Sequence, residues 1–144
     1  MLTEDEVRQA SDQFYAALNR VLNGDARPMI EVWPHNSDVT TMHPIGGREV
    51  GWEQVRVPWE QVAAISSGGQ ITLRDPLIRV VGDLAYQIGT EASEGTLAGQ
   101  QVSSEQRVTN IYRREAGGWK MVHHHTDLSP AMQEIVAGLQ PPTG

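Results

Sequence analysis

The sequence predicts an α+β fold in which N-terminal helices pack on one face of a strongly curved, mostly antiparallel sheet. Apolar residues recur every three or four positions through roughly the first 67 residues, as in amphipathic helices. From residue 70 onward the pattern changes to strand-like runs separated by turn residues. The chain has 144 residues, a length typical of one domain with its own core.

Three helices are expected in the first half and a fourth near the C-terminus. The first begins at a capping box in residues 3–6 and ends near Gly24, and a second, short helix follows it. The third covers residues 51–66, where Pro58 predicts a kink or a division into two pieces. The last begins at Ser129. These positions leave the middle and the end of the chain for the sheet.

One short strand and four longer ones are expected. The short strand covers residues 39–43 and ends at Pro44, before a Gly46-Gly47 turn. Pro76 predicts a bulge or an edge position within the first long strand. The four long strands cover residues 70–81, 84–94, 101–114 and 119–127. We therefore expect a single domain over residues 1–127 and an extension over residues 128–144.

Composition excludes several classes of function. The chain has 11 Lys and Arg against 18 Asp and Glu, and this net charge of −7 argues against nucleic acid or an anionic membrane as the partner. It has no cysteine, which excludes disulfides, thiolate catalysis and cysteine metal sites. No apolar run approaches the roughly 20 residues that span a bilayer, and the N-terminus is acidic rather than signal-like. A cytoplasmic protein is expected.

Two segments carry a family resemblance. The first is HPIGGREVGW in residues 43–52, and the second is GGWKMVHHHTD in residues 117–127. With these segments the chain resembles the SnoaL-like family of the NTF2-like superfamily, which includes ketosteroid isomerases, polyketide cyclases and binding proteins. The resemblance implies a cone of helices and curved sheet with an apolar pocket at its wide end. It also implies a small-molecule ligand and a homodimer formed through the outer sheet face.

The resemblance also implies catalytic residues. In the isomerases a carboxylate base stands directly before the proline of the first strand, and here that position is His43. An apolar pocket would keep its imidazole neutral and able to take a proton. Arg107 or Tyr15 would stabilise the developing negative charge; the family's oxyanion tyrosine falls nearest Ala17, two residues from Tyr15. The alternatives are that His43 only caps its strand and that Arg107 pairs with a neighbouring acid.

Strand alternation sorts the remaining candidates into faces. If His43 points into the pocket, Thr41 points there too, whereas Thr40 and Met42 point away. On the last strand Trp119, Met121, His123 and His125 would share one face. On the strand before it Arg107, Thr109 and Ile111 would share one face, and the resemblance favours that face as the inner one. Tryptophans form pocket walls or simply fill the core. The predicted ligand-binding residues are Trp33, Thr41, Trp52, Trp59, Thr109, His123 and His125.

Three classes of function remain open. The first is an isomerase, cyclase or dehydratase that transfers a proton on an apolar carbonyl compound, and the second is a binding protein that uses the same pocket without chemistry. The third is a dimerisation or scaffold domain, suggested by apolar residues after the last strand. A zinc site of His43, His123 and His125 is conceivable. No carboxylate has a place as its partner, so neither a metal nor a cofactor is expected.

Overall fold

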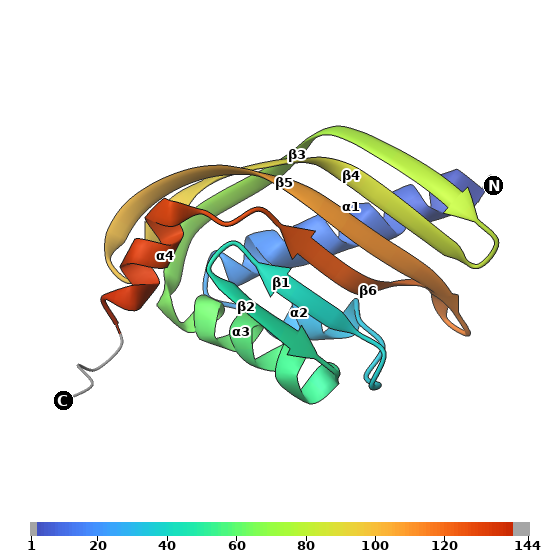
Figure 1. Cartoon of the computed structure of the whole chain (residues 1–144), viewed down its shortest axis with the longest axis horizontal. Coiled ribbons are helices and arrows are strands. Elements are labelled where there is room, and N and C mark those ends of the chain that lie inside the picture. Colours follow the sequence, from blue (N-terminus) through green and yellow to red (C-terminus); the bar gives the residue numbers. More distant parts are fainter. Residues whose placement is uncertain (1–2, 140–144) are drawn as a thin grey trace.

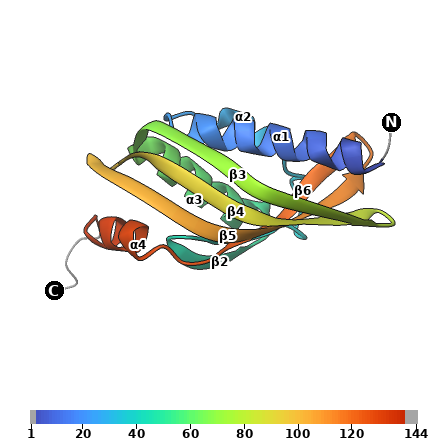
Figure 2. The same ribbon diagram turned by 90° about the horizontal axis from the view of Figure 1, so that it is seen from above.

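The computed structural model describes residues 3–139 and confirms the α+β layout. Three helices lie along the concave side of one curved sheet, and a fourth lies near one end of it (Figures 1 and 2). The helices are α1 (Thr3–Val21), α2 (Arg27–Glu31), α3 (Trp52–Ile65) and α4 (Pro130–Ala137). No helix in this part of the chain is both long enough and apolar enough to cross a membrane.

The sheet has six strands in the order β2-β1-β6-β5-β4-β3. Every neighbouring pair is antiparallel except β1 and β6, which run parallel. This pairing brings the first strand of the chain beside the last one. The strands are β1 (Thr40–His43), β2 (Gly46–Val50), β3 (Ser66–Val81), β4 (Leu84–Leu97), β5 (Gln100–Glu115) and β6 (Gly118–Thr126).

Helix α1 forms one wall of the core and covers the edge of the sheet. Its apolar stripe includes Phe14 and Val21, both fully buried. Asn19 lies on the side that faces the edge strand β3. Its side chain accepts a hydrogen bond from the Ile71 backbone N–H at 2.9 Å and donates one to the Ile71 carbonyl at 3.2 Å. The amide of Asn19 therefore pairs backbone groups that an edge strand would otherwise leave open.

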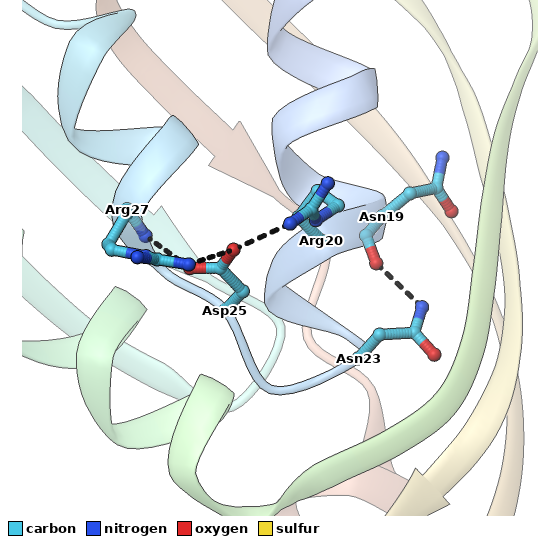
Figure 3. Close-up of polar contacts among 5 residues, drawn as sticks. All are labelled: Asn19, Arg20, Asn23, Asp25 and Arg27. Atoms are coloured by element: carbon cyan, nitrogen blue, oxygen red, sulfur yellow. Dashed lines mark hydrogen bonds and ion pairs between the residues drawn. The ribbon is translucent and has the colours of Figure 1, made fainter.

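The turn between α1 and α2 is held by side chains of both helices (Figure 3). The Asp25 carboxylate accepts from Arg20 at 2.8 Å and from the Arg27 Nε at 3.0 Å. These guanidinium partners hold the pKa of Asp25 well below its usual range. Asn23 donates to the Asn19 carbonyl at 2.8 Å. The turn thus fixes the direction in which the chain leaves α1.

Several expected elements differ in detail from the structure, and one detail is confirmed. Helix α3 is a single helix that contains Pro58, not two pieces. Residues 46–50 form strand β2 and complete a hairpin with β1, where only a turn was expected. The bulge predicted at Pro76 is confirmed, because the β3–β4 register shifts between Arg74 and Leu77, and β3 is also an edge strand. The long strands β3, β4 and β5 extend past the predicted bounds.

Candidate functional site

A mostly apolar cavity lies between the helices and the concave face of the sheet. Its volume is about 90 Å³. Its apolar walls come from α1, α3, β3 and β4 and from Met132 of α4. Four polar side chains of the central strands, all buried, also line it: His43, Glu91, Gln106 and His124.

His43 lies in the cavity wall at the end of β1. Thr41 and Val39 point inward with it, so the predicted alternation of this strand is confirmed. The imidazole packs perpendicular to the Trp59 ring, with ring centroids 4.6 Å apart. Burial lowers the pKa of His43 to about 4, so its ring is neutral at physiological pH. A neutral imidazole in an apolar cavity is able to accept a proton.

Glu49 approaches His43 from the neighbouring strand β2. Its Oε1 lies 3.7 Å from the His43 Nε2, which has no hydrogen-bond partner among residues 3–139. The Thr41 hydroxyl, directly across the hairpin, donates to the same Oε1 at 2.6 Å. A Cβ on Gly47 would come within 2.8 Å of the Glu49 Oε2, so glycine leaves room for this carboxylate. The hairpin therefore holds a carboxylate beside the imidazole.

Glu91 is a second buried carboxyl group, and it lies on β4. Its Oε2 accepts a hydrogen bond from the Tyr15 hydroxyl at 2.8 Å, and its Oε1 accepts one from the Gln106 side chain at 3.0 Å. Burial raises the pKa of Glu91 to about 7, against the opposing effect of these two donors. Burial and the charge of Glu91 also raise the pKa of Tyr15. Tyr15 thus contacts Glu91 directly, a contact that the sequence did not predict.

A chain of buried hydrogen bonds connects Glu91 with His124 on β6. The Asn110 amide donates to the Tyr15 hydroxyl at 3.0 Å and to the Gln87 carbonyl oxygen at 3.2 Å. The Asn110 Oδ1 lies 2.7 Å from the His124 Nδ1. Burial lowers the pKa of His124, as do the nearby imidazoles, so this ring is also neutral. The core under the cavity is therefore a connected polar network.

A bulge in β6 overturns the predicted face of the last strand. Ile111 of β5 pairs with His123 and Tyr112 pairs with Met121, so Val122 is an extra residue in β6. Trp119 and Met121 point inward, but beyond the bulge the inward residues are His124 and Thr126. His123 and His125 therefore point away from the cavity. The His123 Nδ1 lies 2.6 Å from the Thr40 hydroxyl on the outer face.

The face of β5 that carries Arg107 and Thr109 is also the outer one, opposite to the face that the resemblance favoured. Inward positions of this strand are held by Asn110 and Tyr112, both fully buried. The Arg107 side chain is 84% exposed and forms an ion pair with Asp127, with Nε 2.8 Å from its Oδ2. Arg107 thus lies outside the cavity. It pairs with a neighbouring acid, which is the alternative expected from the sequence for this residue.

The predicted tryptophans fall into three settings. Trp59 lines the cavity. Trp33 packs behind it in the core, with ring centroids 6.4 Å apart. Trp52 stacks on His35 at 4.2 Å, away from the cavity.

The zinc site considered for His43, His123 and His125 does not form, because His43 faces inward whereas His123 and His125 face outward. Within residues 3–139 no group of three metal-ligating acids or histidines comes together.

Comparisons with known proteins agree with this architecture. The model of the SnoaL-like domain family matches residues 7–132. No curated protein sequence matches the chain. A proposed dehydratase of the NTF2-like family from Streptomyces avermitilis is similar in structure, with a TM-score of 0.78, 27% identity and coverage of 88% of this chain and 95% of that one.

Two further solved structures show the same fold at lower identity. A proposed aromatic ring hydroxylase from Novosphingobium aromaticivorans is 20% identical, with a TM-score of 0.74 and coverage of 96% of this chain and 90% of that one. The CaMKII hub of S. rosetta is also 20% identical, with a TM-score of 0.70 and coverage of 88% and 96%. The three proteins are named for widely different roles, so the fold alone does not determine the function.

Proposed function

Since the chain belongs to the SnoaL-like domain family, we propose that it binds a small, largely apolar carbonyl compound in its cavity and transfers a proton on it. One observation carries this proposal: the neutral His43 and the buried Glu91 line the same apolar cavity. A base and an acid in one water-poor site are the two groups that proton transfer next to a carbonyl requires. The dehydratase name of the relative at 27% identity also favours small-molecule chemistry.

His43 is the base in this proposal. The imidazole takes a proton from the carbon next to the carbonyl, and the electron pair of that C–H bond forms the C=C double bond of an enolate while the π pair of the carbonyl moves onto its oxygen. In its protonated form the Glu91 carboxyl donates a hydrogen bond to the carbonyl oxygen and stabilises the charge that develops there. Return of the proton to another carbon isomerises the compound, whereas departure of a neighbouring hydroxyl as water dehydrates it.

Glu49 orients the base. Because its carboxylate lies 3.7 Å from the Nε2 of His43, it favours the form of the ring that carries its hydrogen on Nε2. The edge of the ring that carries Nδ1 is then left for the cavity and accepts the proton. When the ring becomes positively charged, the nearby carboxylate stabilises it, as the orienting acid does in catalytic triads.

Hydrogen exchange into a simple ketone tests this function without knowledge of the natural substrate. The protein is incubated with cyclohexanone in deuterated water, and deuterium next to the carbonyl is measured by NMR. We expect exchange above the buffer rate for the natural protein and none for His43→Leu. His125→Leu, on the outer face, is the matched control and should exchange as the natural protein does. Ketone binding without exchange would contradict the proposed enzyme activity and would favour a protein that binds its ligand without chemistry.

A second, compatible function is association into a homodimer. The outer face of the sheet exposes large apolar side chains that a monomer gains nothing by exposing, namely Leu77 of β3 and Leu84, Tyr86 and Ile88 of β4. This is the face through which the family resemblance implies dimerisation, and the cavity stays accessible from the opposite side of the sheet.

A further inference from the structure

His124 is held in one hydrogen-bonding form by the residues behind it. Its Nδ1 lies 2.7 Å from the Asn110 Oδ1, and both residues are almost completely buried. An amide oxygen only accepts hydrogen bonds, so the ring nitrogen facing it must carry the hydrogen. A neutral imidazole has a single N–H, which leaves Nε2 with a free lone pair.

The orientation of the Asn110 amide is fixed independently. The Tyr15 hydroxyl has one hydrogen and donates it to Glu91, so toward Asn110 it can only accept. The Gln87 oxygen beside Asn110 also only accepts, and it takes a further hydrogen bond from the Tyr112 hydroxyl at 2.9 Å. The nitrogen of the Asn110 amide must therefore face Tyr15 and Gln87. Its oxygen must face His124.

The free nitrogen of His124 is directed to the cavity. The ring lines the cavity, while its Nδ1 edge is turned to Asn110 in the core, so the edge that carries Nε2 is the part left to face a ligand. Around it the cavity is mostly apolar, and a lone pair that faces apolar surface loses the hydrogen bonds that bulk water would give it. A bound molecule that supplies a donor at this point would replace one of those bonds.

We infer that the cavity takes a small ligand that carries a hydroxyl group, and that this hydroxyl donates its hydrogen to the Nε2 of His124. The inference rests on the proposed function, because it assumes that the cavity is a ligand site. It narrows the ligand from any apolar carbonyl compound to a hydroxylated one, such as a phenol or a hydroxy ketone. Sites built to bind a hydroxyl reject the analogue that lacks it far more strongly than apolar pockets distinguish shapes.

Phenol and toluene form a matched pair of probes, because they differ only in a hydroxyl and a methyl group on the same ring. We expect the natural protein to bind phenol at least about tenfold more tightly than toluene. The hydrophobic effect alone would give the opposite order, because transfer from water into an apolar cavity is more favourable for toluene than for phenol. Titrations followed by NMR of protein labelled with ¹⁵N in histidine provide both dissociation constants. The same spectra show whether His124 carries its hydrogen on Nδ1 and whether phenol shifts its Nε2.

A variant pair separates His124 from the rest of the molecule. His124→Leu should lose the preference for phenol and bind toluene more tightly than phenol. His125→Leu, one residue away and on the outer face, should keep the natural preference. Removal of the imidazole leaves the Asn110 oxygen without its partner, which destabilises the His124→Leu variant. If this variant does not fold, the spectra of the natural protein alone decide the question.

The possible results distinguish this inference from the proposed function. A phenol preference with a shift of the His124 Nε2 supports the inference. Equal binding of both probes, or a hydrogen on the Nε2 of His124, overturns it while the cavity remains a ligand site. If neither probe binds, the proposed ligand site fails and the inference fails with it.

Discussion

The two imidazoles of the cavity are held by different partners. His43 has a carboxylate, Glu49, near its Nε2, whereas His124 has a neutral amide oxygen, Asn110, at its Nδ1. A carboxylate stabilises a protonated ring, but a neutral amide provides little compensation for a buried positive charge. His43 is therefore the better base, and His124 is the better hydrogen-bond acceptor.

At the scale of single residues, Glu49→Gln tests how His43 is oriented. The glutamine still accepts from Thr41, but it no longer stabilises a positive charge on His43. We expect the rate of deuterium exchange into cyclohexanone to fall at least about tenfold, with the fold kept intact. Rates measured from pH 2.5 to pH 7 give the apparent pKa of the base, because the pKa of His43 is about 4 in the natural protein. That pKa should fall in the variant because the stabilising charge is gone.

The matched control for this prediction is Glu53→Gln. Glu53 lies on the exposed face of α3, where its side chain pairs with Arg56. The exchange rate and its pH profile should stay as in the natural protein. An equal loss of rate in both variants would contradict a specific role for Glu49.

Sequence reasoning found some of these side chains and missed others for identifiable reasons. His43 was predicted because the family motif and the alternation of its strand place it, and Trp59 because a tryptophan in helical register forms a pocket wall or fills the core. Glu91 was missed because β4 reverses the usual pattern: Gln87 and Glu91 are buried, whereas three large apolar side chains of the same strand are exposed, namely Leu84, Tyr86 and Ile88. His124 was missed because a bulge shifts the alternation of β6 by one residue, and nothing in the three consecutive histidines marks where that shift occurs.

At the scale of elements, the hairpin of β1 and β2 determines the geometry around His43. Its turn places Gly46 opposite His43 and Glu49 opposite Thr41. The sequence predicted β1 and the turn but not β2, because two glycines and an exposed, polar strand give almost no strand signal. The division into two pieces expected at Pro58 was derived from a local rule, but α3 continues unbroken from Trp52 to Ile65.

Gly47→Ala tests whether this hairpin is built around the Glu49 carboxylate. Gly47 has a φ of +87°, and an added Cβ would lie 2.8 Å from the Glu49 Oε2. We expect the free energy of unfolding to fall by about 1–3 kcal/mol, the sum of the backbone cost and the displaced carboxylate. Urea denaturation measures the stability, and the exchange assay should show a loss of rate as well.

Gly99→Ala is the control for this backbone cost. Gly99 also has a positive φ of +79°, but a Cβ there would meet nothing within 4 Å. Its substitution should reduce stability by no more than about 1–2 kcal/mol and leave exchange unchanged. If both variants exchange at the natural rate, the position of Glu49 does not matter to the site.

At the scale of the whole molecule, the placement of Glu91 in the core makes stability depend on pH. Its pKa is about 7 in the folded protein against 4.5 in the reference state, so between these values the folded chain holds a proton that the unfolded chain has lost. The stabilising effect of that proton is complete below pH 4.5 and is lost as the pH rises to about 7. The contribution of this group thus falls by about 3 kcal/mol over that range.

Glu91→Gln removes this dependence while it keeps the shape of the side chain. The difference in the free energy of unfolding between the variant and the natural protein should therefore move in favour of the variant by about 3 kcal/mol from pH 4.5 to pH 7.5. Denaturant titrations at several pH values measure it. His43 acts in the opposite direction below pH 6.5 but cancels in this difference. A difference that stays constant with pH would show that Glu91 is not buried as described.

The outer face of the sheet makes a prediction about assembly. Ile88→Glu places a charge in the middle of the exposed apolar side chains of β4, and we expect it to convert a dimer into a monomer. Sedimentation velocity measures the change. Val57→Glu, which alters an exposed apolar residue on α3, is the control and should leave the dimer intact. A natural protein that sediments as a monomer would contradict the assembly.

The parallel pairing of β1 with β6 has a consequence for how the molecule matures. Thr41 of β1 pairs with His124 of β6, across a gap of 83 residues in the chain. His43 and His124 can meet only after the intervening hairpins have formed and the last strand has left the ribosome. Long-range pairing of this kind is slow to form, because the ordering of a long loop precedes any gain from the contact. A nascent chain that ends before residue 118 therefore lacks β6, α4 and the His124 and Met132 side chains of the cavity wall, and the cavity is among the last features to appear.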